Sequence, residues 1–520
     1  MSSPSSMRWL SLVGTIWLQS ISATNTDFPA YSSQLKHILS ISQVQLNNLA
    51  FASDAGKLFG WISGIAAVYL PLWLVLLIGT ALGLVGYGVQ FLFLVNKIAA
   101  LQYWQIFLLT VLAGNSICWI NTVCYVITIR NFPFDRKIAV GISNSYVGLS
   151  AKIYTAMVDA FYHGAPSTNS RAYLLLNSVV PMGVSIVTAP LMREPKTGGS
   201  TYMVSGFVVM FFVTIVTGVY AVMGTVGPLS KLIPPRVHAV GLGILLSAPL
   251  AIPVSAMVVD FVKGRFQIKR EMRVHSFSME EDGVGERVAN EVKEEGALER
   301  EVVGVEEQMG VRMMVRRVEF WLYFFVYMFG ATLGLVFLNN LGQIAESRGL
   351  SKSSSLVSLS SSFGFFGRLM PSLMDYFLAK SRYAVSSTAC IATLMAPMTG
   401  AFFMLLNTTT ISLYISTAVI GVCTGAITSI AVATTSELFG TKNFSVNHNI
   451  IVANIPIGSL LFGYFAAILY QKEGDDGNGR CMGADCYSKT FLIWGSICSL
   501  GTLLSFILYL RIRKSQLERG

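Results

Sequence analysis

SDAGKLFGWISG, from Ser53 to Gly64, carries an acid and a base three residues apart within a long apolar run. FGFFGRLMPSLMD, from Phe363 to Asp375, has the same order of glycine, basic residue and leucine at its centre. The two glycines, Gly56 and Gly367, are 311 positions apart (367 − 56). Charged residues within membrane-spanning helices are costly and usually face the inside of a bundle. The two stretches therefore predict a membrane protein whose helices form an internal repeat.

The composition of the chain indicates a polytopic, all-α membrane protein. Its 520 residues are 53% hydrophobic and 12% charged, with a mean hydropathy of +0.60, whereas soluble domains have about 25% charged residues. The apolar runs reach the roughly 20 residues that a helix needs to cross a bilayer. The net charge of +10 is spread over loops and the end of the chain. This distribution favours a role in orienting helices and argues against nucleic-acid binding.

Fourteen apolar segments have the length of a spanning helix, and an even number places both termini on one side of the membrane. A basic cluster, VKGRFQIKREMR, begins at Val262, directly after the eighth segment. Such a cluster beside a helix end marks the cytoplasmic side, so both termini are predicted to be cytoplasmic. The segments lie near residues 8–29, 49–70, 72–95, 104–128, 139–162, 170–191, 201–225, 237–261, 319–341, 354–378, 384–406, 410–434, 447–470 and 490–511.

Two features of the loops on the other side of the membrane agree with this orientation. Asn407-Thr408-Thr409 is a glycosylation sequon in a loop predicted to face away from the cytoplasm. Cys481 and Cys486 share another loop on that side, where a disulfide persists. The sequence thus predicts an integral membrane protein with a glycan at Asn407 and a disulfide between the two loop cysteines. It leaves the plasma membrane and an endomembrane as alternatives.

A second match supports the repeat. Asn144-Ser-Tyr-Val-Gly148 parallels Asn454-Ile-Pro-Ile-Gly458 at an offset of 310 (454 − 144). Both copies begin on the same side of the membrane, so they are parallel and related by an axis along the membrane normal. The two halves of major facilitator transporters are arranged in this way. The predicted fold therefore has two parallel six-helix repeats with two extra helices between them, about fourteen helices in total.

The domain boundaries follow from this layout. The stretch 262–318 mixes acids and bases with few aromatic residues, which is typical of a disordered linker. The predicted domains are 1–191, a first six-helix bundle; 192–261, two inserted helices; 262–318, a cytoplasmic linker; 319–511, a second six-helix bundle; and 512–520, a cytoplasmic tail.

The chain also resembles a known family. In the first half SATNTDFPAYSSQLK and SDAGKLFGWISGIAAVYLPLW, and in the second half SELFGTKNFSVNHNIIVANIPIGSLLFGYFAAILY and CMGADCYSKTF, are similar to the plant nodulin-like group of the major facilitator superfamily. Members of this group are often named for a nuclear-fusion-defective phenotype. The resemblance covers nearly all of the chain outside 262–318. It implies a transporter fold without defining the cargo, and some distant superfamily relatives exchange small carboxylates.

A general superfamily motif implies a cytoplasmic gate in the second half. The motif is Gly-x-x-x-Asp-Arg, followed by basic residues, after the second helix of a repeat. The second half keeps Asp375, Lys380 and Arg382, with Pro371 at the glycine position and Tyr376 at the arginine position. The first half reads GIAAVYLPLW there and has no charge. The resemblance thus implies gating through Asp375, Lys380 and Arg382, without a matching network in the first half.

The few charges well inside the predicted helices are Asp54, Lys57, Lys152, Asp159 and Arg368. Asp54 and Lys57 are neighbours on one helix face, so either they form a structural ion pair or they serve a ligand. Arg368 likewise either pairs with the acid seven residues later or serves a ligand. Lys152 breaks the repeat, because its counterpart is Phe462 (152 + 310). An asymmetric charge in a symmetric scaffold favours a role with cargo.

Basic side chains that converge on a central cavity favour an anionic ligand, which accepts charge-assisted hydrogen bonds. The predicted function is secondary transport of a small organic anion by alternating access between the two halves. The alternative is a receptor or membrane scaffold of the same fold that moves no cargo. The predicted substrate-binding residues are Lys57, Lys152, Arg368 and Asn25, and the predicted proton-coupling or ion-pair residues are Asp27, Asp54 and Asp159.

The sequence shows no phosphate-binding loop, no arrangement typical of a catalytic triad and no metal-ligand spacing. We therefore expect neither an enzyme nor a bound cofactor or metal. The expected partners are the lipid bilayer and a small-molecule solute, and protein partners stay open.

Overall fold

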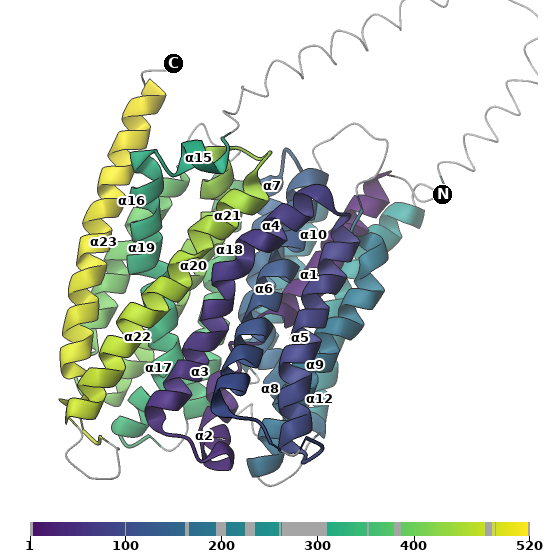
Figure 1. Ribbon diagram of the computed structural model, residues 1–520. Coiled ribbons are helices and arrows are strands. Elements are labelled where there is room, and N and C mark those ends of the chain that lie inside the picture. Colours follow the sequence, from purple (N-terminus) through teal and green to yellow (C-terminus); the bar gives the residue numbers. More distant parts are fainter. Residues whose placement is uncertain are drawn as a thin grey trace, which may run out of the picture.

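The computed structural model describes residues 4–98, 100–161, 166–193, 204–223, 234–258, 262, 309–350, 353–378, 386–473, 481–483 and 485–517. In this part of the chain the protein is built from helices that run side by side, without a β-strand. Figure 1 shows the helices of the first half, in purple to blue, beside those of the second half, in green to yellow. The start of α1 and the end of α23 lie at the same end of this bundle. We call it the terminal end, and the other the far end.

Most predicted spans correspond to one helix or to two helices in line. The first half contains α1 (Pro4–Ser22), α2 (Phe28–Leu39), α3 (Gln43–Ala55), α4 (Gly60–Tyr69), α5 (Leu72–Leu94), α6 (Tyr103–Asn131), α7 (Arg136–Ser145), α8 (Ser150–Phe161) and α9 (Pro166–Thr188). The inserted helices are α10 (Val204–Met223) and α12 (Pro235–Ser247). The second half contains α15 (Val311–Met314), α16 (Val318–Tyr327), α17 (Leu333–Ser347), α18 (Ser353–Leu378), α19 (Ser387–Met404), α20 (Thr410–Phe439), α21 (Phe444–Val452), α22 (Asn454–Glu473) and α23 (Asp485–Leu517).

Short turns join several of these helices without ending the span. The 3₁₀ turn Gly56–Phe59 connects α3 to α4, and Tyr146–Leu149 connects α7 to α8. Two further 3₁₀ turns, Ala189–Leu191 and Ala248–Leu250, follow α9 and α12. A π-helical turn, Met328–Thr332, lies between α16 and α17, and such turns often mark functional positions.

Ten helices among the described residues are long and apolar enough to cross a membrane. The predicted spans outside these ten are α1, α3 with α4, α7 with α8, and α18. Three of them contain the buried Lys57, the buried Lys152 and the half-buried Arg368, and α1 ends at a turn. Polar residues inside the bundle therefore lower the hydropathy of the helices that surround its centre.

Several helices extend beyond their predicted ends. The span predicted to end at residue 434 continues to Phe439, and the span predicted for 490–511 runs from Asp485 to Leu517. The first predicted span also differs, because α1 stops at Ser22 and the chain resumes as α2 up to Leu39. Hydropathy marks the part of a helix that meets lipid, whereas backbone hydrogen bonding continues into polar residues.

The repeat is visible in equivalent close contacts. A Cβ atom added to Gly56 would lie 2.3 Å from the carbonyl oxygen of Val111 in α6. A Cβ atom added to Gly367 would lie 2.2 Å from the carbonyl oxygen of Val422 in α20. Val111 and Val422 are themselves 311 positions apart (422 − 111). The same pair of backbones thus packs in the same way in both halves, and only glycine fits at the contact.

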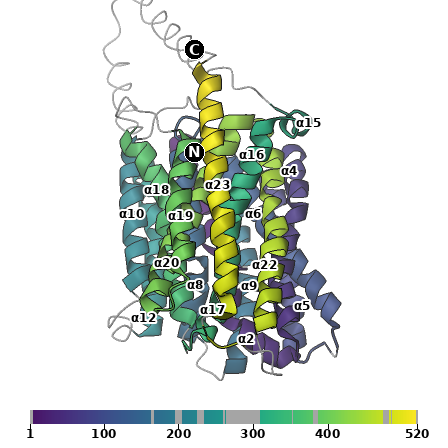
Figure 2. The same ribbon diagram turned by 90° about the vertical axis from the view of Figure 1, so that its left-hand side faces the viewer.

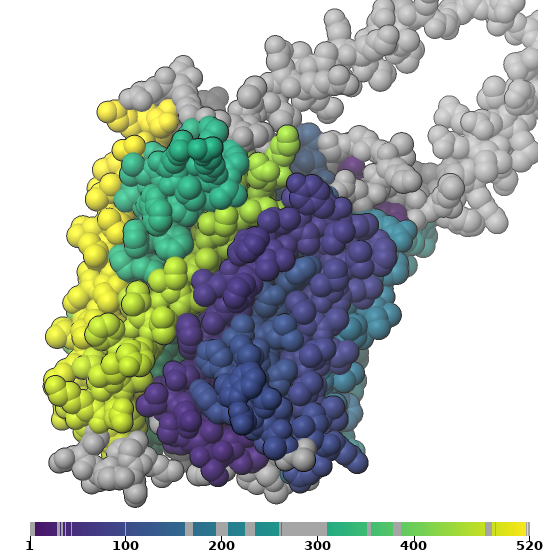
Figure 3. Space-filling view, in the orientation of Figure 1, coloured from purple at the N-terminus to yellow at the C-terminus, as the bar shows by residue number. Residues whose placement is uncertain are grey.

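The two halves meet along two seams that the repeat relates to each other. In the first seam α3 and α4 pack against α22 and α21; in the second seam α7 and the turn after it pack against α18. Gly56 and Gly367 belong to equivalent helices, as do Asn144 and Asn454, so each seam joins the same two helices of the repeat with the halves exchanged. Figure 3 shows the first seam on the surface, where α22 and α21 lie against α3 and α4.

The two inserted helices lie outside the repeat. α10 packs against α18, α7 and α12, whereas α12 packs mainly against α8. At the edge of the bundle, α10 runs beside α18 (Figure 2). Trp9 of α1 anchors this side through edge-on contact with Phe207, whose ring centroid lies 4.9 Å away. The inserted helices therefore cover one flank of the bundle and leave both seams in place.

The far end holds the predicted disulfide and the glycosylation sequon. Cys481 and Cys486, the two loop cysteines expected to pair, are joined by a disulfide. Asn407 lies in the turn before α20, where its Oδ1 accepts a hydrogen bond from the backbone N–H of Thr409. Arg348 closes the same end by donating to the carbonyl groups of Leu405 and Asn407.

At the terminal end the chain enters the second half through Met309, which is buried. Its backbone N–H donates to the Phe439 carbonyl over 3.2 Å, and its own carbonyl accepts hydrogen bonds from Asn443 and Asn447. Most of the predicted linker, from residue 263 to 308, lies outside the described residues. The same is true of Lys380 and Arg382.

Candidate functional site

A polar cavity of about 130 Å³ lies between the two halves, near the middle of the bundle. A smaller cavity of about 80 Å³ adjoins it, and both are lined by Asn25, Thr26, Val147, Leu335 and Arg368. We call the two together the central cavity. The larger part is also lined by Ala23, Lys57, Ile117, Cys118, Asn121, Thr122, Tyr125, Asn144, Tyr327, Thr428, His448, Asn449, Val452 and Ile455.

The interruption after α1 brings Asn25 and Thr26 into the cavity wall. Buried tyrosines fix this turn by occupying polar groups that the helix no longer pairs: Tyr154 donates to the Ile21 carbonyl, and Tyr87 donates to Oγ1 of Thr24, both over 3.0 Å. Backbone carbonyls at the end of a helix need such partners. The predicted site residue Asn25 therefore lines the central cavity because the first span is broken there.

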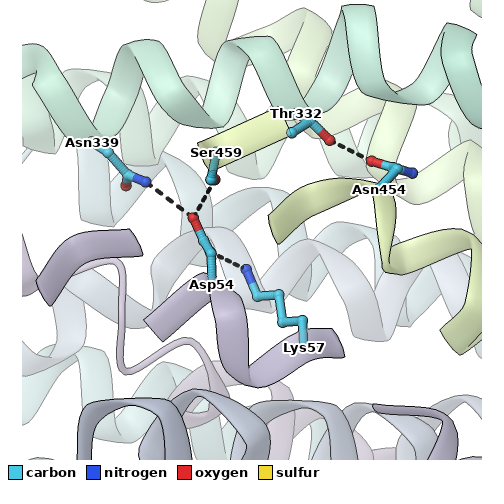
Figure 4. Close-up of polar contacts among 6 residues, drawn as sticks. All are labelled: Asp54, Lys57, Thr332, Asn339, Asn454 and Ser459. Carbon is cyan, nitrogen blue, oxygen red and sulfur yellow. Dashed lines mark hydrogen bonds and ion pairs between the residues drawn. The ribbon is translucent and has the colours of Figure 1, made fainter. Parts of the chain in front are cut away.

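Asp54 and Lys57 form an ion pair of 2.6 Å at the edge of the central cavity (Figure 4). Both are buried, with 2% and 8% of their surfaces exposed. The second carboxylate oxygen of Asp54 accepts a hydrogen bond of 2.6 Å from Ser459 and one of 3.4 Å from Asn339. The two residues thus form the ion pair that was one of the two alternatives from the sequence, and the acid also links the first half to α22 and α17 of the second half.

Arg368 occupies the position in the second half that Lys57 has in the first (57 + 311). The position equivalent to Asp54 is Phe365 (54 + 311), so the arginine lacks the acid that its counterpart has. Within the described residues, its one hydrogen bond joins Nη1 to the Gly364 carbonyl over 3.4 Å. Among the described residues, Arg368 also forms no ion pair with Asp375. A guanidinium group without a counter-ion thus faces both parts of the central cavity.

Asp375 lies nearer the terminal end, in a separate cavity of about 20 Å³ that is also lined by Lys137 and Ser387. Lys137 pairs with Glu437 across the two halves at 2.5 Å. Burial lowers the pKa of Lys137, but the adjacent Glu437 carboxylate outweighs burial and leaves the pKa above its ordinary value. Of the three residues predicted to form a gate, Asp375 is the one that the structure describes, and it lies beside this inter-half ion pair.

Three predicted site residues lie away from the central cavity. Lys152 is buried in α8, the helix against which α12 packs, and Asp159 of the same helix is exposed. Asp27 is fully buried and accepts a hydrogen bond of 3.3 Å from Asn177, while its Oδ2 atom has no partner among the described residues. The structure therefore brings Asn25, Lys57 and Arg368 together and places the other three elsewhere.

The cavity wall also contains asparagines that the sequence did not single out. Asn144 Oδ1 accepts a hydrogen bond of 3.1 Å from the Tyr125 hydroxyl, and its Nδ2 has no partner among the described residues. Its repeat counterpart, Asn454, is saturated: Oδ1 accepts from Thr332 over 2.6 Å (Figure 4), and Nδ2 donates to the Ile451 carbonyl over 2.7 Å. The NSYVG and NIPIG match marked both positions, but only the partners on other helices distinguish them.

The fold, with a cavity between its two halves, is that of the major facilitator transporters. Among solved structures, the chain is similar to a proton-dependent oligopeptide transporter (TM-score 0.55, 12% identity, 98% of this chain and 100% of that chain). It is also similar to a proton:xylose symporter (TM-score 0.54, 11% identity, 96% of this chain and 95% of that chain). At such low identity these similarities show the fold alone.

Comparison of sequences shows the family. Residues 8–254 match the family model described as Nodulin-like, and residues 302–516 match the model described as NFD4, C-terminal domain. The chain is 38% identical over 530 residues to Protein NUCLEAR FUSION DEFECTIVE 4 of Arabidopsis thaliana, covering 97% of this chain and 89% of that protein. The protein belongs to the nodulin-like family, which confirms the resemblance seen in its sequence.

Proposed function

We propose that the protein is a secondary transporter that moves a small organic anion by alternating access between its two halves. One observation carries the proposal: Arg368 lines the central cavity without an acidic partner among the described residues, whereas its repeat counterpart Lys57 is paired with Asp54. Removing a charge from water is unfavourable unless another group compensates it. An anionic ligand would supply that compensation at Arg368.

The chemistry of Arg368 and Lys57 indicates that the two residues have different roles in the proposed site. The planar guanidinium group offers several N–H donors that match the two oxygens of a carboxylate. Lys57 is already engaged at 2.6 Å with Asp54, so it contributes mainly to the wall of the cavity. In the proposed site Arg368 therefore binds the anion directly, and Asn25 adds an amide from the broken first span.

The position of the cavity supports alternating access. The first seam closes one side of it through the Asp54–Ser459 hydrogen bond, and the second seam closes the other through a 2.5 Å hydrogen bond from Ser361 to the Gly148 carbonyl. Parallel halves that rock about a central site expose that site to one side of the membrane at a time.

Uptake of a mixed pool of labelled small carboxylates into proteoliposomes tests the proposal. We expect saturable uptake that Arg368→Gln lowers about a hundredfold, the scale for removing one partner of a buried, hydrogen-bonded charge pair. Arg348→Gln is the matched control, because Arg348 binds carbonyl groups at the far end and does not line the central cavity. It should stay within about twofold of the unmodified protein, since it leaves the anion site unchanged.

Two results would contradict the proposal. Anion uptake that is unchanged in Arg368→Gln would remove the central guanidinium group from the transport site. Binding of a carboxylate that stabilises the purified protein but never crosses the membrane would favour the alternative of a receptor with a transporter fold.

A further inference from the structure

We propose that the anion bound in the central cavity carries a hydroxyl group, so that the substrate class is that of short hydroxy acids. The inference rests on the proposed function, because it describes a second group on the same ligand. It is drawn from two asparagines that line the cavity and that each have one amide atom without a partner among the described residues: Asn144 with its Nδ2 and Asn121 with its Oδ1.

These two atoms are buried polar groups in a cavity that also holds Arg368. Asn144 is 3% exposed, and both unpaired atoms are closed off from solvent. Buried polar side-chain atoms are normally hydrogen-bonded, so each exception calls for an explanation. A ligand that bonds to these amides while its carboxylate meets Arg368 explains all three open groups at once.

A hydroxyl group is the simplest complement to the two amides. It has one donor hydrogen and two acceptor lone pairs, so it can accept from an amide N–H and donate to an amide oxygen. It also fits either orientation of an asparagine side chain, because the two ends of the amide differ in donating and accepting. With the amides oriented as in the structure, a carboxylate alone, which only accepts hydrogen bonds, would leave the Asn121 oxygen unpaired.

An ammonium group is a poorer complement than a hydroxyl. The larger part of the central cavity has no Asp or Glu among its lining residues, all of which the structure describes. Asp54 lines the smaller part, but its two oxygens are already paired with Lys57 and with Ser459 and Asn339. An amino acid would therefore bring a positive charge that no open carboxylate compensates.

The repeat shows that the open amide is not a general feature of this fold. Asn454 has the same place in the second half, yet both ends of its amide are bonded, to Thr332 and to the Ile451 carbonyl. Asn454 also does not line the central cavity. Of these two asparagines, the one with an amide end that is unpaired among the described residues is thus Asn144, which lines the central cavity.

The size of the cavity limits the ligand. The larger part has a volume of about 130 Å³, well above the roughly 10–15 Å³ that one water molecule needs on such a measure. The adjoining 80 Å³ extends this space past Arg368. Together they suit an acid of three or four carbons, and larger sugars or peptides would need the halves to separate further.

Thermal-shift titration of the purified protein with matched probes tests the inference. Lactate, propionate and alanine share a three-carbon carboxylate and differ in one group; malate, succinate and aspartate form the four-carbon series. We expect the hydroxy acid of at least one series to bind about tenfold more tightly than the unsubstituted acid, the scale of one hydrogen bond. The amino acid should bind more weakly than the hydroxy acid.

Asn144→Ala should remove the preference by lowering affinity for the hydroxy acid to that for the unsubstituted acid. Asn454→Ala is the matched control and should keep the preference, because Asn454 lies outside the cavity wall. If Asn144→Ala does not fold, the comparison of the hydroxy acids with the unsubstituted acids on the unmodified protein still tests the inference. Equal affinities within both series, each lost in Arg368→Gln, would overturn the hydroxyl assignment and leave the anion site intact. No carboxylate binding at all would instead overturn the proposed function.

Discussion

The two seams between the halves use the same helices of the repeat but different chemistry. In the first seam Ser459 donates a hydrogen bond of 2.6 Å to Asp54, which also holds Lys57. The equivalent positions in the second seam are Leu149 (459 − 310) and Phe365 (54 + 311). There, a Cβ atom on Gly148 would lie 2.7 Å from the backbone of Phe365. The first seam thus holds a buried carboxylate, whereas the second is close backbone packing with a hydrogen bond from Ser361 to the Gly148 carbonyl.

This difference shows which features the repeat has retained and which have diverged. The backbone contact at Gly56 is repeated at Gly367 almost unchanged. The side chains facing the other half differ, and the loss of the acid at Phe365 leaves Arg368 without its intrahelical partner. Symmetric packing thus maintains the scaffold, whereas the asymmetric charges create a place for a ligand.

The largest expected effect comes from breaking the buried ion pair of the first seam. Lys57→Met leaves Asp54 buried without a counter-charge and should lower the free energy of unfolding by about 3–5 kcal/mol. Arg368→Met, at the equivalent position, removes a charge that has no acidic partner among the described residues and should cost much less. Unfolding of both variants in detergent, followed by circular dichroism, measures the contrast.

The double variant Asp54→Asn with Lys57→Met serves as the control. It removes both charges, so much of the stability lost in Lys57→Met should return. Equal destabilisation by Lys57→Met and Arg368→Met would mean that the two positions are energetically alike, and the proposed division between the halves would fail.

The next effect compares Ser459 of the first seam with Gly148, the residue beside the equivalent position in the second seam. Gly148→Ala places a methyl group against the backbone of Phe365 and should cost about 3 kcal/mol, the upper part of the usual range for overpacking. Ser459→Ala removes one hydrogen bond to a charged group and should cost about 1.5 kcal/mol. The same unfolding measurement ranks them. A larger cost for Ser459→Ala would show that the first seam holds the halves together more strongly than the second seam does.

Much of the fold could be predicted from the sequence because it depends on periodic, local signals. The apolar runs, the glycine pair Gly56 and Gly367 and the basic cluster near Val262 are all visible without tertiary information. The interruption after Ser22 was not predicted, because it is fixed by the hydroxyl groups of Tyr154 and Tyr87 from other spans. No local sequence pattern predicts hydrogen-bond partners that come from other spans.

The site was predicted only in part for a similar reason. Lys57 and Arg368 followed from buried charge at repeated positions, and both line the central cavity. Lys152 also stood out as a buried charge, but it lies in the helix that α12 covers. Asn144 was overlooked as a binding residue because an asparagine inside a helix is informative only when its hydrogen-bond partners are known. Hydropathy and spacing identify a helix face, and packing decides which neighbour meets it.

The smallest expected effect concerns the ion pair between Lys137 and Glu437, which joins the halves close to the second seam at 2.5 Å. Their side chains are 32% and 29% exposed, so water screens the pair. Lys137→Met should therefore cost at most about 1 kcal/mol, far less than Lys57→Met.

The pH dependence of this pair has a defined sign. The pKa of Lys137 is above its ordinary value because Glu437 outweighs the opposing effect of burial. A raised folded-state pKa stabilises the protein below the unfolded value of about 10.4, and that contribution disappears as the pH rises through the folded value. The difference in unfolding free energy between the unmodified protein and Lys137→Met should thus be constant from pH 7 to 9 and shrink above pH 10. A difference that grows above pH 10 would show that Glu437 does not hold the lysine in its charged form.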